Sequence, residues 1–185
     1  MSDDDIVWEF DGGDGRTDVL MALVVQQLNA LDSLLPEGED EDDPMARLAA
    51  ELSERPVELL DSNPALARLF PPALADAKEA EQFRRDAIGQ QARARRTAGR
   101  TVLADCAVDD GVDDGMVAVR KDHVDAWVTT LAGLRAAWNV ELTGSAERQV
   151  SVSRSNIRAN PTAATICDWL GAVLEDALQA HMFQS

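Results

Sequence analysis

At 185 residues the chain can bury a hydrophobic core without disulfides or metals, and its hydrophobic content of 45% is typical of a folded protein. Its net charge of −17 disfavours nonspecific binding to nucleic acids and to anionic membranes, and it favours basic protein partners. The sequence does not begin with a basic segment followed by an apolar run, and it has no apolar stretch long enough to span a membrane. We therefore expect a cytoplasmic protein with no membrane partner.

The first fifty residues predict a strand, a turn and a helix. Apolar and polar residues alternate over residues 6–10, before the turn-forming residues 11–15, and residues 116–119 are a candidate pairing partner for this strand. From Thr17 onwards, leucines recur at three- and four-residue steps, which indicates a helix with Thr17 or Asp18 as its N-cap. The helix should end before Pro36.

An acidic segment follows the leucine-rich helix. Six of the seven residues from Glu37 to Asp43 are acidic, so we interpret residues 36–44 as a mobile loop. The alternative is a tail that docks on a basic partner. Pro44 is expected to begin the next helix and Pro56 to end it, while residues 64–70 form a short helical segment.

Longer helices are predicted in the second half of the chain. A weak apolar stripe favours a helix over residues 72–106, in which Gly89 and Gly99 predict a kink or break. Clear apolar stripes mark two more helices, over residues 124–138 and 166–181. Three tryptophans on these stripes are expected in the core: Trp127, Trp138 and Trp169. The polar segment between them, residues 142–161, is predicted to be a long loop with a short strand near residues 150–153.

Together these elements predict a mainly α fold. We expect a single domain over residues 1–185, with about five or six helices and a small two-stranded β element. The apolar stripes could also form the interface of a homodimer, because periodicity does not distinguish a core from a subunit contact.

The known motifs for catalysis, cofactors and metals do not fit this sequence. His123 and His181 each lack a second ligand at helical spacing, and we interpret both as structural. Residues 105–115 fail as a calcium loop because the required glycine and glutamate positions hold other residues. Residues 11–15 lack the lysine of a phosphate-binding loop. We therefore expect no enzyme activity, no cofactor and no metal.

Arginines concentrate between residues 84 and 100, where six arginines and one aspartate give a local charge of +5. Four of them would share one side of a continuous helix: Arg85, Arg93, Arg96 and Arg100. This stripe could bind DNA, or it could be a docking surface for an acidic partner. It could also neutralise residues 1–50, where fourteen acidic and two basic residues give a charge of −12. We favour neutralisation or docking, because aromatic residues do not alternate with the arginines.

Several stretches resemble an actinobacterial family first known as a domain of unknown function and now associated with AosR, a regulator of the oxidative-stress response. The resemblance rests on Pro64-Ala-Leu-Ala-Arg-Leu-Phe-Pro-Pro, Glu81-Gln-Phe-Arg-Arg, Thr101-Val-Leu-Ala-Asp, Asp122-His-Val-Asp-Ala-Trp-Val-Thr-Thr-Leu-Ala-Gly-Leu-Arg and Asp168-Trp-Leu-Gly-Ala-Val-Leu-Glu. It covers nearly the whole chain, and its motifs are mostly helix-core residues.

The resemblance implies a cytoplasmic, transcription-linked regulator that acts through protein contacts, for example with a sigma factor, and that can respond to thiol redox state. Cys106 and Cys167 are the only cysteines and hence the candidate redox residues. They could form a bridge if their helices pack together. Two alternatives stay open: a DNA-binding regulator that uses the arginine stripe at 84–100, and an interaction module in which both thiols stay reduced.

Overall fold

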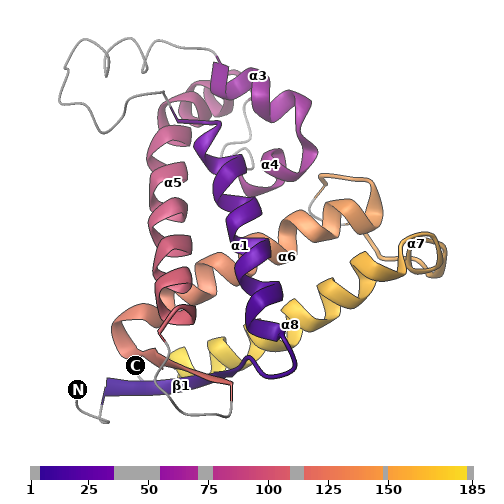
Figure 1. The fold of residues 1–185 in the computed structure, drawn as a ribbon. Coiled ribbons are helices and arrows are strands. Elements are labelled where there is room, and N and C mark those ends of the chain that lie inside the picture. Colours follow the sequence, from indigo (N-terminus) through magenta and orange to yellow (C-terminus); the bar gives the residue numbers. More distant parts are fainter. Residues whose placement is uncertain (1–4, 36–54, 71–76, 109–114, 148–149, 183–185) are drawn as a thin grey trace.

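A computed structural model describes residues 5–35, 55–70, 77–108, 115–147 and 150–182, with only the backbone given for residues 55–57 and 77–86. Helices dominate the described residues, as the sequence predicts (Figure 1). The elements are β1 (Ile6–Asp11), α1 (Arg16–Asp32), α3 (Arg55–Ser62), α4 (Pro64–Leu69), α5 (Ala77–Cys106), β2 (Met116–Arg120), a short 3-10 helix (Lys121–His123), α6 (Val124–Thr143), α7 (Arg154–Ala159) and α8 (Pro161–Met182). The seven α-helices described exceed the five or six expected.

The two predicted strands pair with each other, as proposed. β1 and β2 form an antiparallel sheet in which Trp8 lies opposite Val119 and Phe10 lies opposite Val117, with an irregularity between Ile6 and Trp8. Phe10, Val117 and Val119 are buried, so one face of the sheet packs against the helices. A two-stranded sheet is marginal in water by itself, and this packing supplies the support that it needs.

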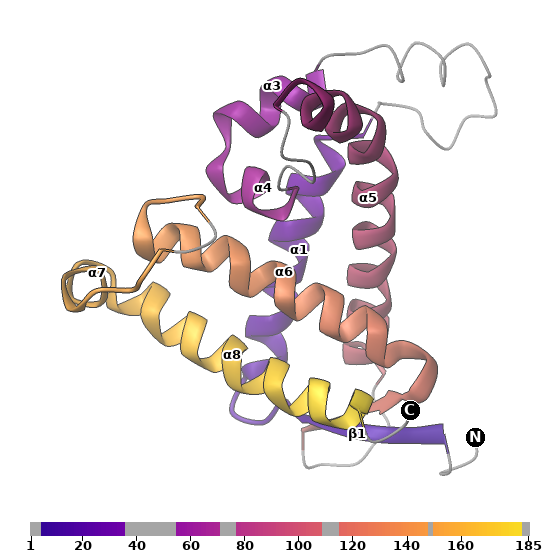
Figure 2. The ribbon, with the colours of Figure 1, turned by 180° about the vertical axis from the view of Figure 1, so that it is seen from behind.

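Helices α6 and α8 lie side by side and antiparallel, α5 packs on α6, and α1 packs mainly on α5 (Figure 2). The His181–Asp125 contact of 3.4 Å places the end of α8 beside the start of α6. The main core lies between these helices and the sheet. Its largest fully buried side chain is Trp127, whose ring meets Trp8 edge-on at 5.3 Å and lies 5.6 Å from Phe10. Trp138 and Trp169 are only partly buried against this core.

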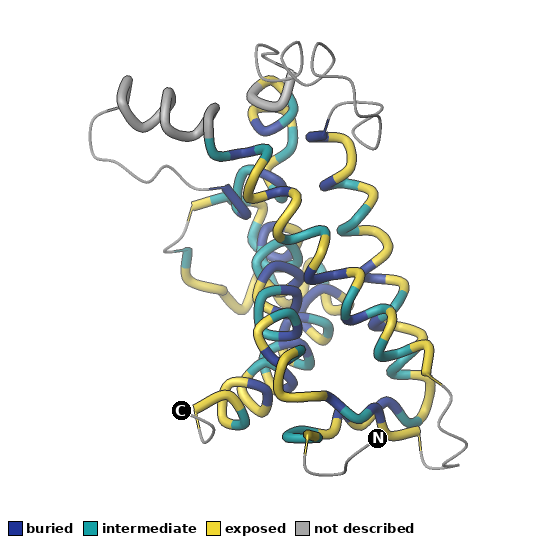
Figure 3. The backbone as a smooth tube through the Cα atoms, turned by 90° about the vertical axis from the view of Figure 1, so that its left-hand side faces the viewer, coloured by how far each residue is buried: buried dark blue, intermediate teal, exposed yellow. Residues whose placement is uncertain are grey.

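A second cluster of buried side chains fills the space between α3, α4, α5 and the end of α1. It contains Leu31, Leu34, Leu35, Leu60, Leu66, Leu69, Phe70, Ile88 and Ala92. In both clusters the buried residues lie on the sides of the helices that face one another, and the residues on the outer sides are exposed (Figure 3).

The structure corrects two predicted boundaries. The N-cap of α1 is Gly15, with a φ of 79° and no side-chain cap, whereas Thr17 and Asp18 lie inside the helix. Pro56 lies in the first turn of α3 and does not end a helix, because a first-turn proline needs no amide partner. The acidic segment at 36–44, the start of a helix at Pro44 and the Asp/Gly-rich residues 109–114 lie outside the described residues.

Two predictions for the second half of the chain are wrong. The break that was one of the two alternatives at Gly89 and Gly99 is wrong, because α5 is continuous through both glycines for 30 residues. At Gly99 a Cβ atom would lie 2.9 Å from Cδ2 of Leu28, so the glycine allows α1 and α5 to approach closely. The predicted loop at 142–161 contains the end of α6 and the whole of α7, and residues 150–153 form no strand.

Candidate functional site

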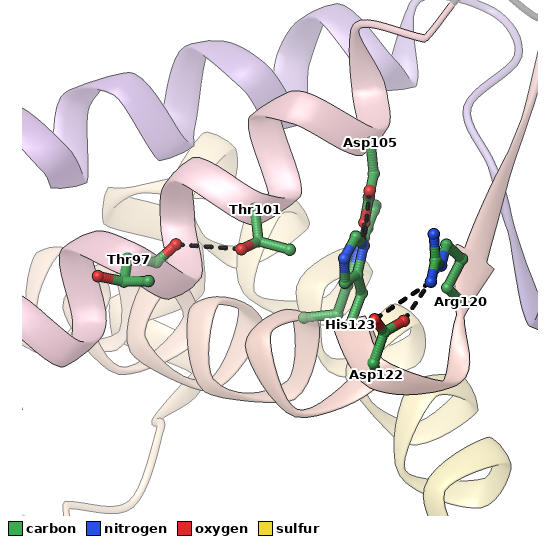
Figure 4. Close-up of polar contacts among 7 residues, drawn as sticks. Thr97, Thr101, Asp105, Arg120, Asp122 and His123 are labelled. Atoms are coloured by element: carbon green, nitrogen blue, oxygen red, sulfur yellow. Dashed lines mark hydrogen bonds and ion pairs between the residues drawn. The ribbon is translucent and has the colours of Figure 1, made fainter.

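A set of hydrogen-bonded polar side chains joins the end of α5 to the start of α6 (Figure 4). Asp105 lies in the last turn of α5, and its carboxylate accepts a hydrogen bond of 2.8 Å from Nε1 of Trp127. Nδ1 of His123 lies 2.8 Å from Oδ1 and 3.1 Å from Oδ2 of the same carboxylate. We call Asp105, His123 and Trp127 the Asp105 cluster.

The Asp105 cluster lies at the boundary between the core and the surface. The Asp105 side chain is 11% exposed and that of His123 is 30% exposed, so the carboxylate lies inside and the imidazole lies at the surface. When Nδ1 donates its hydrogen to Asp105, Nε2 is the ring nitrogen that is left to make a second hydrogen bond. Thr101, one turn before Asp105, donates its hydroxyl to the carbonyl of Thr97 on its own helix. The arrangement fixes the imidazole and ties two helix ends together.

The neighbouring ion pair is a surface contact. Nε and Nη2 of Arg120 lie 3.2 and 3.3 Å from the two carboxylate oxygens of Asp122 (Figure 4). Both side chains are about half exposed or more, so the pair contributes little to stability. His123 contacts the carboxylate of Asp105, and this acidic partner was not foreseen from the sequence. Asp105 and His123 are 18 residues apart, and the sequence has no signal that connects them.

The candidate redox residue Cys106 directly follows Asp105 and is partly buried. Burial raises the pKa of the Cys106 thiol to about 12, and the negative charge of Asp105 acts in the same direction. The thiolate is the form that reacts with peroxide and disulfides. The surroundings of Cys106 therefore keep this thiol protonated and slow to react at neutral pH.

The structure does not bring Cys106 and Cys167 together, and both are free thiols. Cys106 lies beside the cluster at the start of α6, whereas Cys167 packs with Leu142 at the end of α6. From Val124 to Leu142 the helix rises about 27 Å, and a disulfide needs Cα atoms within about 7 Å. An intramolecular bridge does not fit this fold. Burial also raises the pKa of Cys167, while the nearby Arg135 guanidinium opposes the shift.

The arginines of the predicted basic stripe differ in their surroundings. Arg93 and Arg100 are exposed on α5, and the Arg85 side chain is outside the described residues. Nη1 of Arg96 lies 3.4 Å from Oδ1 of Asp32 at the end of α1. This pair agrees with the hypothesis that the stripe neutralises acidic residues of the same molecule.

Arg95, which the stripe does not include, is the arginine that the fold uses internally. Its guanidinium donates a 3.3 Å hydrogen bond to the carbonyl of Leu69 and lies 5.8 Å from the centre of the Phe70 ring. Burial lowers the pKa of this guanidinium. Arg95 lies on the same side of α5 as the buried residues Ile88 and Ala92, because the three are spaced four and three positions apart. This spacing was the signal in the sequence that Arg95 faces inward.

The described residues contain neither a metal-binding group nor a membrane-spanning helix. Within the part of the chain that the structure describes, three or more His, Cys, Asp or Glu side chains do not gather into a metal-binding group. The described helices include none with the length and apolar character to cross a membrane. The fold and these contacts define a mainly helical protein whose two-stranded sheet is packed on a helix pair and whose buried polar groups hold helix ends together.

The chain belongs to the family described as a domain of unknown function (DUF2017), whose model matches residues 2–181. Neither the curated proteins nor the solved structures include a significant match to the chain.

Proposed function

We propose that this protein is a cytoplasmic, transcription-linked regulator of the oxidative-stress response that acts by binding another protein and catalyses no reaction itself. Two features support the proposal: the resemblance to the family associated with AosR, and the charge of −12 over residues 1–50. An acidic surface attracts a basic partner over long range and increases the rate of association. The partner class that fits is a basic transcription protein, such as the DNA-contacting region of a sigma factor.

The observation that carries the proposal is the outer face of α1, which is both acidic and partly apolar. Asp14, just before the helix, has a side chain that is 97% exposed, and Asp18 in the first turn is also exposed. Val19 and Val25, both on the half of the helix that is turned away from the core, are 46% and 44% exposed. Apolar side chains flanked by carboxylates suit a partner that pairs basic with apolar groups. We call these four residues the α1 outer face.

The proposed link to oxidative stress is through the partner and not through an internal disulfide. Cys106 is held protonated, and Cys167 lies at the far end of α6. If a disulfide between protein cysteines contributes, it must join two molecules. This intermolecular route stays open in the proposal.

Charge-reversal variants test the proposal. The protein is immobilised, and the binding of purified sigma factors is measured by biolayer interferometry at about 50 mM and about 300 mM salt. We expect binding that weakens with salt and falls at least about tenfold in Asp14→Lys/Asp18→Lys. The matched control, Glu175→Lys/Asp176→Lys, makes the same change of charge at exposed positions of α8 and should bind as the original protein does.

Two outcomes would contradict the proposal. Equal loss in both variants would mean that total charge, and not the α1 outer face, drives association. Failure to bind any transcription protein even at low salt would remove the proposed partner class.

A further inference from the structure

Helix α7 is an ordered helix in which every residue lies away from the core. It contains no buried residue, and it projects at the end of the α6–α8 pair, away from β1 (Figures 1 and 2). Short helices in water are unstable unless something holds them. Here a capping box closes the first turn: the Ser153 hydroxyl accepts from the amide of Asn156, and the Asn156 side chain accepts from the amide of Ser153.

The other end of α7 is anchored to two helices. Asn160 follows the helix, and its Oδ1 accepts a 3.2 Å hydrogen bond from the amide of Ala163 in α8. Its Nδ2 donates a 3.4 Å hydrogen bond to the carbonyl of Glu141 in α6. The sequence thus uses polar side chains at both ends to hold α7 in one orientation, although the helix buries nothing.

The residues that α7 presents are basic and apolar. Arg154, Ile157 and Arg158 share one side of the helix, because residues three and four positions apart are neighbours. Ile157 is 45% exposed, and Val152 just before the helix is 42% exposed. Neither guanidinium is paired with an acid among the residues that the structure describes. We call Val152, Arg154, Ile157 and Arg158 the α7 surface.

The sequence segment that carries the α7 surface is basic, unlike the chain as a whole. Residues 150–167 contain two arginines and no acidic residue, a local charge of +2 in a chain of net charge −17. A local basic surface on an acidic molecule selects small or local acidic partners, because long acidic polymers are repelled by the rest of the protein. Arginine also binds carboxylates with two parallel hydrogen bonds.

We propose that the α7 surface is a docking site for an acidic protein segment that carries apolar side chains, with Arg154 and Arg158 binding carboxylates on either side of Ile157. This contact is separate from the one proposed for the α1 outer face, which is acidic and would take a basic partner. A fixed helix loses little freedom on binding, so its affinity is not reduced by an ordering cost.

The test uses a defined probe: a fluorescent helical peptide of glutamate and leucine, spaced so that both residue types lie on one side. Anisotropy with the full chain should show saturable binding that weakens as salt rises. Arg154→Glu/Arg158→Glu should weaken binding at least about tenfold, and Ile157→Ser several-fold. The control, Arg120→Glu/Lys121→Glu, makes the same charge change at exposed positions at the end of β2 and should bind like the original protein. Because α7 buries no residue, all variants should keep the original melting temperature.

Other results would overturn the proposal. A peptide with glutamine in place of glutamate, or with serine in place of leucine, must bind more weakly; equal binding contradicts the claimed chemistry. Duplex DNA that binds through the same two arginines more tightly than the peptide would indicate a nucleic acid partner. Self-association in analytical ultracentrifugation that Arg154→Glu/Arg158→Glu abolishes would show that a second copy occupies the surface.

Discussion

Nδ1 of His123 lies 2.8 Å from Oδ1 of Asp105, and this contact joins the last turn of α5 to the residues that begin α6. The same carboxylate accepts from Nε1 of Trp127, the largest fully buried side chain. One carboxylate therefore orients both the tryptophan at the centre of the core and the imidazole at its edge. Hydrogen bonds to an ionised acceptor are stronger than neutral ones.

Asp105→Asn should lower the free energy of unfolding by about 1–3 kcal/mol, because the new amide group turns an N–H towards a group that donates. Urea denaturation monitored by tryptophan fluorescence measures the loss. The matched control is Asp122→Asn, whose ion pair with Arg120 is exposed, and which should change stability by less than about 0.5 kcal/mol. Equal effects of the two variants would mean that the Asp105 cluster does not hold the helices.

The two glycines inside α5 should respond to alanine with opposite signs. Among the described residues, a new Cβ at Gly89 would meet the end of the flexible Arg93 side chain, at 3.4 Å, so Gly89→Ala should raise stability by up to about 1 kcal/mol. At Gly99 the Cβ would lie 2.9 Å from Leu28 and 3.4 Å from Val24, so Gly99→Ala should cost about 1–2 kcal/mol. Thermal unfolding of both variants checks the signs. A stabilising Gly99→Ala would show that α1 and α5 are not closely packed.

Helices with a buried stripe could be predicted from the sequence, and helices without one could not. The recurring apolar residues of α6 and α8 face the core, and the alternation in β1 and β2 matches their buried face. Helix α7 has no buried side chain, so it has no apolar period, and its only signal is the Ser153-to-Asn156 capping spacing.

The contacts of His123 and Arg95 were not predicted from the sequence, for other reasons. The partner of His123 is 18 residues away, and such a pairing depends on how α5 meets α6. The internal role of Arg95 was missed for another reason: its helical phase, shared with Ile88 and Ala92, indicated the buried side of α5, but this phase was not used in the prediction. Residues 36–44 and 109–114 lie outside the described residues, so the predicted acidic loop is untested.

The Cys106 thiol should be unreactive at neutral pH. Its pKa is raised from 9.0 to about 12, so the folded protein keeps the proton while the unfolded chain loses it above pH 9. Stability should therefore be independent of this group below pH 9 and should fall as pH rises from 9 towards 12. Cys106→Ala should remove that part of the alkaline decline, which denaturant titrations at several pH values would detect.

Mild peroxide at neutral pH tests the same residue chemically. We expect two free thiols and an unchanged intact mass, because Cys106 is protonated and Cys167 is too far away to form a bridge. A loss of two daltons that a reductant reverses would indicate a Cys106–Cys167 disulfide, and the fold would then have to rearrange. A doubled mass would instead support the intermolecular route.

The Arg96–Asp32 pair should contribute a small, salt-dependent coupling between α5 and α1. The side chains are 20% and 48% exposed and their nearest charged atoms are 3.4 Å apart, a geometry in which water and ions screen much of the attraction. A double-mutant cycle with Arg96→Gln and Asp32→Asn should give a coupling energy below about 1 kcal/mol that shrinks in high salt. The cycle is needed because Arg96 makes further contacts, which a single substitution would also remove. A coupling of zero at low salt would mean that the basic stripe does not neutralise α1, and the exposed Arg93 and Arg100 would then be better explained as part of a surface for an acidic partner.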